Sequence, residues 1–272
     1  MATASVNGIT VGFDVLGEGP DTLLLVHGHP FNRSMWHPQL GAVREAGWRV
    51  IVPDLRGYGE TSVVPGQTTL DAFAADLAAL LDHLSCDGAV IGGLSMGGQI
   101  VMEFARQYPH RVRGLLLAAT FPQAETAEGR QARYAMADRF LREGMQPYAL
   151  DVLSKMLAPR SIELLPAVAD HVTRMMLATN PEGAAAAVRG RAERPSYEET
   201  LASVAVPALV VVGSEDAFTT RRDAERMRDL LRDSELAWLE GVGHMPNLER
   251  PEAFNAALLD LLARSVRAHT IP

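Results

Sequence analysis

A serine set between glycines, Ser95, is the residue whose surroundings in this sequence most favour chemistry. Residues 93–97 read Gly-Leu-Ser-Met-Gly, follow an apolar run and precede a helix-forming segment, which predicts a strand, a sharp turn and a helix. Such a turn has no room for side chains two residues to either side of the serine, and it exposes the hydroxyl at the carboxyl end of the strand. The following helix directs free N–H groups at an anion forming there. The pattern therefore predicts a nucleophilic serine.

An acid and a histidine come later in the chain, each just after a predicted strand. Residues 208–213 are a continuous apolar run rich in valine, typical of a buried parallel strand, and Asp216 follows it. Residues 236–240 predict the next strand, which His244 follows. Because parallel strands end at one edge of a sheet, we expect Ser95, Asp216 and His244 to meet there. In such a set the histidine takes the serine proton and the carboxylate orients the imidazole.

Two other carboxylates compete for the role of the acid. Asp54 also ends a predicted strand, but it precedes the Arg-Gly-Tyr-Gly stretch at residues 56–59, so we interpret it as a carboxylate that fixes this loop. Glu215 adjoins Asp216, and position alone leaves both open.

The elements that must position these residues alternate between strand and helix over most of the chain. The alternation stops between residues 120 and 201, where the pattern is helical and rich in Met, Ala and Arg. We therefore predict a core formed by residues 1–119 and 202–272 and a helical cap formed by residues 120–201. After a hairpin at 6–16, strands are expected at 22–26, 48–52, 89–94, 112–119, 208–213 and 236–240, core helices at 35–46, 70–84, 219–231 and 251–264, and cap helices at 134–142, 147–157, 167–177 and 181–189.

Composition narrows the class of partner. The chain has 272 residues, 47% apolar and 21% charged, which is ordinary for a globular protein. A net charge of −8 disfavours nucleic acid and anionic membrane surfaces as partners. The single cysteine, Cys86, cannot form an internal disulfide, which fits a reducing compartment. With neither a signal segment nor a membrane-spanning run visible, we expect a cytoplasmic protein with no membrane association.

The chain resembles an α/β-hydrolase along its whole length. The resemblance implies a mostly parallel eight-stranded sheet flanked by helices, with an inserted helical cap, and it favours Asp216 over Glu215 as the acid. Within the superfamily the chain is most similar to small bacterial esterases, 3-oxoadipate enol-lactonases and cofactor-free haloperoxidase-like esterases. The segments that carry the resemblance are residues 27–30, 53–59, 93–97, 213–216 and 243–249.

Two backbone N–H groups should stabilise the oxyanion that forms when the serine attacks. One belongs to Met96, the residue after the nucleophile. By resemblance, the other belongs to His29, which follows the strand at residues 22–26. No histidine or carboxylate lies four residues after His29, so we do not expect it to bind a metal. The expected chemistry needs neither metal nor cofactor.

The residue types at the turn narrow the reaction. A serine there argues against haloalkane dehalogenases and epoxide hydrolases, which carry aspartate, and Met245 differs from the tryptophan common in C–C bond hydrolases. The sequence thus predicts hydrolysis of a small-molecule carboxylic ester or lactone through an acyl-enzyme. Two alternatives stay open: a perhydrolytic, haloperoxidase-like or other non-hydrolytic reaction of the same residues, and a ligand-binding member of the fold without catalysis.

The cap is expected to select the substrate. Its methionines suit an apolar roof, with Met145 and Met175 expected to contact the substrate, and Phe31, Phe218 and Met245 are expected to contact it from the core loops. The roof methionines are Met136, Met145, Met156, Met175 and Met176. One cap arginine is a candidate partner for a substrate carboxylate, but their spacing singles out none of them. The oligomeric state is likewise left open. The cap arginines are Arg130, Arg133, Arg139, Arg160, Arg174, Arg189, Arg191 and Arg194.

Overall fold

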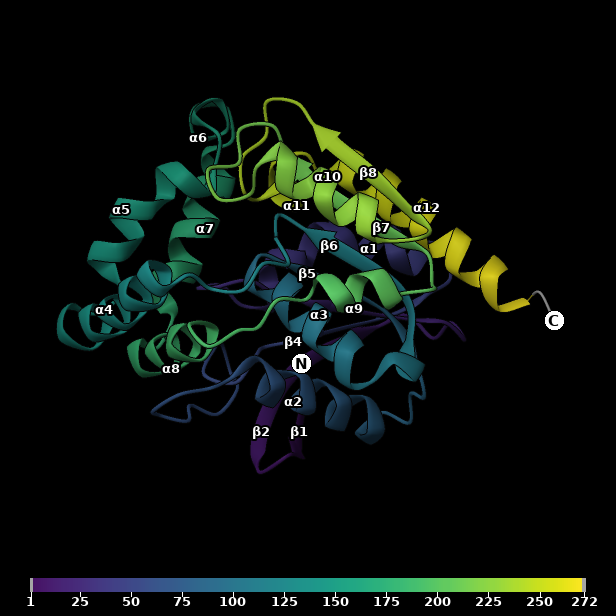
Figure 1. Ribbon diagram of the computed structural model, residues 1–272, viewed down its shortest axis with the longest axis horizontal. Helices are drawn as coiled ribbons and strands as arrows, with labels where there is room; N and C mark the ends of the chain where they lie inside the picture. The colour runs from purple at the N-terminus through teal and green to yellow at the C-terminus, as the bar shows by residue number, and fades with distance from the viewer. Residues whose placement is uncertain (1, 271–272) are drawn as a thin grey trace.

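An eight-stranded sheet in the order β1-β2-β4-β3-β5-β6-β7-β8 forms the centre of the molecule (Figure 1). The computed structural model describes residues 2–270, with side chains described for residues 2–268. β1 (Ala2–Val6) and β2 (Ile9–Leu16) form an antiparallel hairpin, β2 runs antiparallel to β4, and the strands from β4 to β8 are parallel neighbours. The other strands are β3 (Thr22–Val26), β4 (Arg49–Pro53), β5 (Ala89–Leu94), β6 (Val112–Ala118), β7 (Ala208–Gly213) and β8 (Ser234–Leu239).

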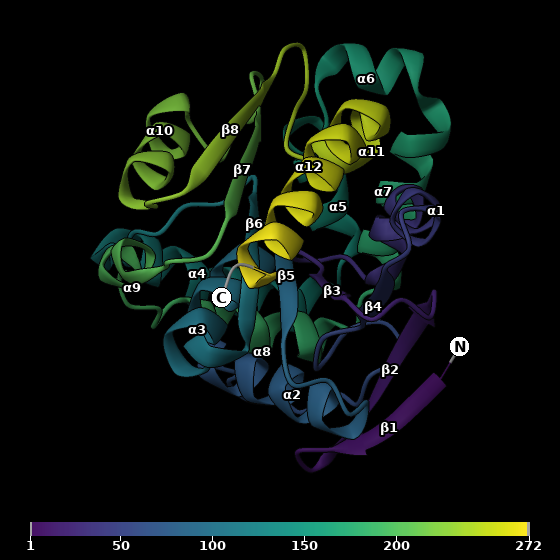
Figure 2. The same ribbon diagram turned by 90° about the vertical axis from the view of Figure 1, so that its right-hand side faces the viewer.

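Helices cover both faces of the sheet (Figure 2). Successive side chains of a buried strand point to opposite faces, so β3 supplies Leu24 to one core and Leu25 to the other. This explains why the parallel strands are apolar throughout. One face carries α1 (His37–Glu45) and α12 (Pro251–Thr270), and the other carries α2 (Leu70–His83), α3 (Met96–Gln107) and α10 (Arg221–Leu230). Shorter helices are η1 (Arg33–Trp36), η2 (Pro109–Arg111) and α11 (Pro246–Glu249).

An insertion of helices separates β6 from β7. Its helices α4 to α8 lie together at the left of Figure 1. Helix α9 instead packs on α3 and α10, and its Leu201 belongs to the core beneath α3. The predicted fold is confirmed, whereas the division of the chain at residues 119 and 202 stays a prediction. The bounds are α4 (Ala127–Glu143), α5 (Gln146–Met156), α6 (Pro159–Leu164), α7 (Pro166–Ala178), α8 (Pro181–Arg191) and α9 (Glu198–Ser203).

The helix bounds differ from expectation mainly in the cap. Helix α4 begins at Ala127, earlier than the apolar pattern indicated, because Thr126 caps it by accepting a hydrogen bond from Gly129 N at 2.9 Å. Helices α6 and α9 were not predicted, since each has only 6 residues and cannot show a helical period.

Helix α8 packs closely on the loop between β4 and α2. A Cβ on Gly183 would lie 2.0 Å from the carbonyl oxygen of Gly57, and one on Gly190 would lie 1.6 Å from that of Thr68. The loop returns a hydrogen bond, from Thr68 N to Ala186 O at 2.9 Å. The small residues of α8 are therefore needed for a close approach, which also fixes the place of Arg191 at the end of the helix.

Candidate active site

Ser95 occupies a strained turn between β5 and α3. Its φ of 58° and ψ of −116° lie in a region of backbone conformation that residues other than glycine rarely adopt. A Cβ on Gly93 would lie 2.3 Å from the carbonyl of Gly97, and one on Gly97 would lie 2.3 Å from Val26 O, so both positions require glycine. Thr120 Oγ1 donates to Ser95 O at 2.8 Å. The neighbouring backbone and Thr120 thus hold the turn in place.

Asp216 and His244 are joined by a hydrogen bond. His244 Nδ1 lies 2.9 Å from Oδ1 and 3.0 Å from Oδ2 of Asp216, and Oδ1 also accepts from the backbone N–H groups of Phe218 and Thr219. Burial opposes ionisation of Asp216, but the charge and hydrogen bond of His244 and the two N–H donors outweigh it and lower the pKa. The carboxylate is ionised and holds the proton of His244 on Nδ1, which leaves Nε2 able to accept another.

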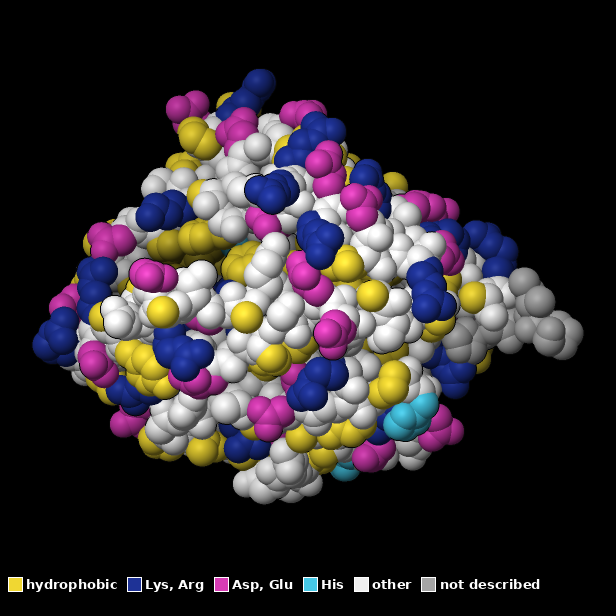
Figure 3. Space-filling view, in the orientation of Figure 1, with side chains coloured by type: hydrophobic (Ala, Val, Ile, Leu, Met, Phe, Trp, Pro, Cys, Tyr) yellow, Lys and Arg dark blue, Asp and Glu magenta, His cyan; other side chains and the backbone are white. Residues whose placement is uncertain are grey.

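A cavity of about 390 Å³ has both Ser95 and His244 in its wall. Residues of both the core and the cap line this cavity. In the view of Figure 3, hydrophobic side chains are visible over the cap helices at the left of the molecule. Its volume is at the small end of the range for ligand pockets, about 300–1,000 Å³. The cap contributes Arg133 and Met136 from α4, Tyr148 and Met156 from α5, and Val188 and Arg191 from α8.

The loop after β3 lies against the serine turn. A Cβ on Gly28 would lie 2.9 Å from Leu94 O, so the loop backbone touches the end of β5, and the next residue, His29, lines the cavity. The side chain of His29 is buried, with Nδ1 2.7 Å from the hydroxyl of Tyr58. Burial lowers the pKa of His29 well below its usual value, and the nearby charges of Arg191 and Arg133 lower it further. His29 is therefore a neutral imidazole.

Of the residues expected to contact substrate, Phe218 reaches the cavity. Its ring lies 4.7 Å from that of His244, centroid to centroid. The structure does not bring the other four to the cavity. Phe31, Met175 and Met245 pack in the core on the α1 side of the sheet, and Met145 packs between α4 and α8.

The cap methionines that line the cavity are Met136 and Met156. Their neighbours in the sequence include equally apolar residues, and hydrophobicity alone does not distinguish a side chain facing a cavity from one facing a packed neighbour. Of the five cap methionines expected to form the apolar roof, Met136 and Met156 lie in the cavity wall, whereas Met145 and Met175 do not.

The rival acid Asp54 forms a separate cluster. Its Oδ1 accepts from Arg33 N at 2.8 Å and its Oδ2 from Glu60 N at 2.9 Å, and its carboxylate pairs with the Arg33 guanidinium. These contacts fix the loop after β4. Asp54 is absent from the wall of the cavity that contains Ser95.

Glu249 is a positioning residue that sequence reasoning missed. Its buried carboxylate accepts hydrogen bonds from Gly243 N at 3.0 Å and Met245 N at 3.2 Å, on either side of His244. It also accepts from Ala158 N of the cap at 2.9 Å. Glu249 thus fixes the loop that carries the histidine and ties it to the cap. The residue stood within a recognised segment, but its contact with Ala158 joins parts of the chain that are 91 residues apart in the sequence.

Arg191 is a second missed residue, since it could not be told apart from the other cap arginines. It lines the cavity, and its Nε donates to Gln99 Oε1 at 2.7 Å. Gln99 stands four residues after Ser95 on α3, so this hydrogen bond brings the guanidinium near the serine turn.

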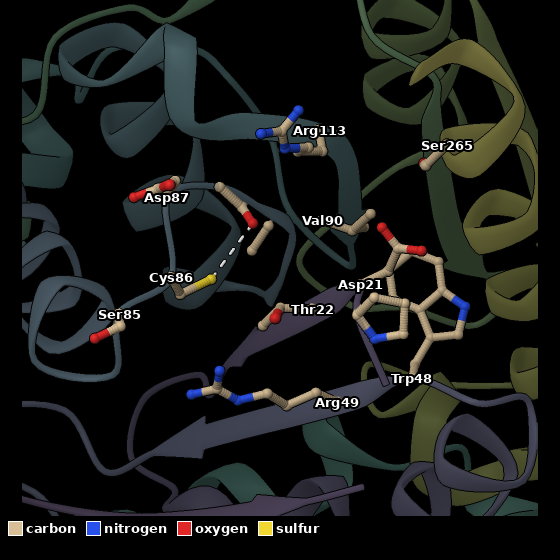
Figure 4. A pocket seen from close by; sticks show the side chains of 13 residues that line it. Asp21, Thr22, Trp48, Arg49, Ser85, Cys86, Asp87, Val90, Arg113 and Ser265 are labelled. Carbon is tan, nitrogen blue, oxygen red and sulfur yellow. Dashed lines mark hydrogen bonds between the residues drawn. The ribbon is translucent and has the colours of Figure 1, made fainter. Parts of the chain in front are cut away.

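Another hollow lies at the opposite, amino ends of the parallel strands (Figure 4). Thr22, Arg49 and Val90, from the starts of β3, β4 and β5, line it together with Cys86. The thiol of Cys86 donates to Gly88 O at 3.4 Å. The cysteine is therefore held at the other end of the strands from Ser95.

Two features are absent from residues 2–270, which the structure describes. Within them, no group of three or more His, Cys, Asp and Glu side chains is arranged to hold a metal ion. No helix in that part of the chain combines the length and apolar character needed to span a membrane.

The sheet order and the serine turn after β5 are those of an α/β hydrolase. A model of the alpha/beta hydrolase family matches residues 23–257, and the chain belongs to this family. The resemblance drawn from the sequence is thus confirmed.

The chain is similar over nearly its whole length to proteins named as esterases and enol-lactonases. It is 28% identical to 3-oxoadipate enol-lactonase 2 of Acinetobacter baylyi, covering 96% of each chain. A malate-bound thermophilic esterase from Thermogutta terrifontis superposes with a TM-score of 0.93 at 35% identity, covering 97% of this chain and 98% of the esterase. The enol-lactonase of Burkholderia xenovorans superposes with a TM-score of 0.89 at 26% identity, covering 96% and 100%. These relatives support a hydrolase of esters or lactones in broad terms.

Proposed function

We propose that this protein is a serine hydrolase that cleaves a small-molecule carboxylic ester or lactone through an acyl-enzyme. The observation that carries the proposal is one cavity wall holding both Ser95, on its strained turn, and His244, bonded to Asp216. The similarity to esterases and enol-lactonases supports the same class of reaction.

In the first step Ser95 Oγ attacks the carbonyl carbon while His244 Nε2 takes the hydroxyl proton. The imidazolium that forms is stabilised by Asp216, which is already ionised and bonded to Nδ1. The negative charge that develops on the carbonyl oxygen receives hydrogen bonds from the backbone N–H groups of Met96 and His29. Such donors are effective because they are held in place before the charge appears.

Collapse of the tetrahedral intermediate breaks the bond to the alcohol, and His244 returns the proton to the departing oxygen. With a lactone the alcohol stays tethered to the acyl group, since both belong to one molecule. Water then attacks the acyl-enzyme while His244 takes a proton from it, and His244 returns this proton to Ser95 Oγ as the bond to the acyl group breaks and the carboxylic acid leaves.

The cap provides the contacts that choose among substrates. Met136, Met156 and Val188 supply apolar surface to the cavity, and Phe218 supplies an aromatic surface beside His244. A cavity of about 390 Å³ suits a short acyl chain or a single small ring.

A panel of short methyl esters and five- and six-membered lactones, with acid release measured at constant pH, tests the reaction class. A fluorophosphonate should also label the protein, with the added mass on the peptide that contains Ser95. Turnover only when peroxide and a short carboxylic acid are supplied would favour the perhydrolytic alternative. Binding of esters without turnover or labelling would favour a ligand-binding member of the fold.

A further inference from the structure

Arg191 is half-buried in the cavity wall and has no acidic partner among the described residues. Among the described residues it forms no ion pair with a carboxylate, and its one hydrogen bond to a side chain runs from Nε to Gln99 Oε1. Burial lowers its pKa well below the usual value, and the charges of Arg133 and Arg194 lower it further. An arginine stays protonated at neutral pH, so the fold places a cation in the wall of a cavity that no carboxylate side chain lines.

The neighbouring charges leave this region positive. Arg133 and Arg194 both pair with Glu125, so three guanidinium groups share one carboxylate. The pKa of Glu125 is lowered, since burial opposes its ionisation but the hydrogen bonds and charges of the two arginines outweigh burial. Glu125 is thus already paired with two arginines, and its charge offsets only part of the positive charge around Arg191. An anion entering the cavity would meet a net positive field in a site of low polarity, where attraction is strong.

The unpartnered polar atoms beside Arg191 can act as donors. Gln99 Nε2 and His29 Nε2 are buried and have no hydrogen-bond partner among the described residues. The Tyr58 hydroxyl lies 2.7 Å from His29 Nδ1, and in the tautomer in which this hydroxyl donates to Nδ1 the hydrogen of His29 is on Nε2. A group that only accepts hydrogen bonds would complement these donors, and an ionised carboxylate is such a group.

We propose that the substrate carries a carboxylate in addition to its scissile ester or lactone bond, and that the Nη groups of Arg191 bind this carboxylate. The inference rests on the proposed function, since it assigns a second contact to the substrate that Ser95 attacks. Arg191 is held by Gln99, about 6 Å along α3 from Ser95. The carboxylate and the scissile carbonyl are therefore a few bonds apart, as in a half-ester of a short dicarboxylic acid or a lactone with a carboxylate side group.

A pair of substrates that differ in one charged group tests this assignment. Monomethyl glutarate carries the carboxylate and methyl pentanoate does not, and acid release at constant pH reports kcat/KM for both. The wild type should prefer the half-ester. In Arg191→Met the ratio of the two kcat/KM values should fall by about 10²-fold, the loss expected when one partner of an enclosed charge pair is removed. Arg191→Lys keeps the charge without the two-pronged geometry and should lower the ratio by about 10-fold.

Arg189→Met is the matched control. Arg189 lies on the same helix, but it pairs with the exposed Asp138 at 2.8 Å and is absent from the cavity wall. Its variant should keep the wild-type ratio. A ratio within about twofold of wild type in Arg191→Met, or an equal fall in Arg189→Met, overturns the assignment. Should Arg191→Met fail to fold, the ratio in Arg191→Lys decides in the same way.

Binding of glutarate separates this inference from the reaction class. Glutarate should raise the Tm of the wild type and not that of Arg191→Met, whereas the neutral analogue glutaramide should raise neither. If no ester or lactone is hydrolysed but glutarate still requires Arg191, the proposed hydrolase function falls and the carboxylate site stands. If esters are hydrolysed but glutarate binds both proteins alike, or binds neither, the carboxylate site falls alone.

Discussion

Arg33 and Arg191 are both enclosed arginines, yet their surroundings have opposite charge. Arg33 contacts three carboxylates, at 2.9 Å from Asp14 and 2.7 Å from Glu60, and it also pairs with Asp54. Burial disfavours its charge, but the hydrogen bonds and charges of these carboxylates outweigh burial and raise its pKa. The pKa of Arg191 is lowered, because burial and two further arginines act on it together.

The contrast is between charged groups that stabilise the fold through partners within the chain and charged groups that are available to bind a ligand. In the Arg33 cluster each carboxylate and the guanidinium find partners within the chain, so the cluster joins β2, η1 and the loop after β4. At the cavity that contains Ser95, Arg191 donates to Gln99 but pairs with no carboxylate of the described residues, and Gln99 Nε2 and His29 Nε2 have no hydrogen-bond partner there. The two acids that follow strands differ in a similar way. Asp54 is bonded to Arg33 away from the cavity, whereas Asp216 is bonded to His244, which lines the cavity.

Removing the proposed nucleophile should give the largest effect, and it should lower activity without lowering stability. Ser95→Ala should lower kcat by about 10⁶-fold, leaving only the catalysis due to the oxyanion donors. Its free energy of unfolding should stay near that of wild type, because the strained backbone is held by Thr120 and the glycines. Ester hydrolysis, fluorophosphonate labelling and urea unfolding measure the three quantities. Labelling of Ser95→Ala at the wild-type rate would place the nucleophile elsewhere.

The two strand-end acids should respond differently to loss of charge. Asp216→Asn should lower kcat by about 10⁴-fold, because the imidazole loses both its orienting carboxylate and the tautomer that leaves Nε2 free. Asp54→Asn should act mainly on stability, since it weakens the bonds to Arg33. The comparison is made on kcat for folded protein and on the urea midpoint of both variants. A larger loss of kcat in Asp54→Asn would reverse the assignment of the acid.

The sequence was sufficient for the parts of the site that follow from local pattern. Apolar runs predicted the buried strands β5 and β7, which Ser95 and Asp216 follow, whereas His244 follows β8, which is only partly buried. Because all three residues follow a predicted strand, their shared edge could be inferred. The glycines at 93 and 97 marked the turn because no other residue fits there.

The parts that depend on distant packing could not be inferred. Arg191 is one of several similar cap arginines, and only the close docking of α8 through Gly183 and Gly190 determines that it reaches the cavity. Phe31 and Met245 stand beside residues of the site in the sequence, but their side chains turn into the core. Local pattern reports that a residue is apolar or charged, and tertiary packing decides what it meets.

Removing Arg33 should lower the free energy of unfolding, which tests the structural half of the contrast with Arg191. Arg33→Met removes the guanidinium that contacts Asp14, Asp54 and Glu60, and we expect the free energy of unfolding to fall by about 3 kcal/mol. Arg226→Met is the control, because Arg226 pairs with Glu198 at the surface and its loss should leave stability nearly unchanged. Urea unfolding at neutral pH measures both. Equal stability of the two variants would contradict the structural role given to Arg33.

The smallest effect concerns the two enclosed histidines, His27 and His29, and it appears as a dependence of stability on pH. Burial lowers the pKa of both, so below about pH 6.5 the unfolded chain takes up protons that the folded protein refuses. The contribution of each histidine to the free energy of unfolding is therefore fully present above about pH 6.5 and is lost as the pH falls below it. The slope is at most about 1.4 kcal/mol per pH unit for each histidine.

Replacing His29 should remove one of these contributions. His29→Gln cannot titrate, so its free energy of unfolding should fall less steeply than that of wild type between pH 7.5 and about pH 5.5, a window above the range in which carboxylates titrate. The exposed His110 supplies the control His110→Gln, which should keep the wild-type slope. Urea unfolding at intervals across the window measures the slopes. If His29→Gln kept the full slope, His29 would take up its proton in the folded protein. Burial and the charges of Arg191 and Arg133 would then not lower its pKa as described.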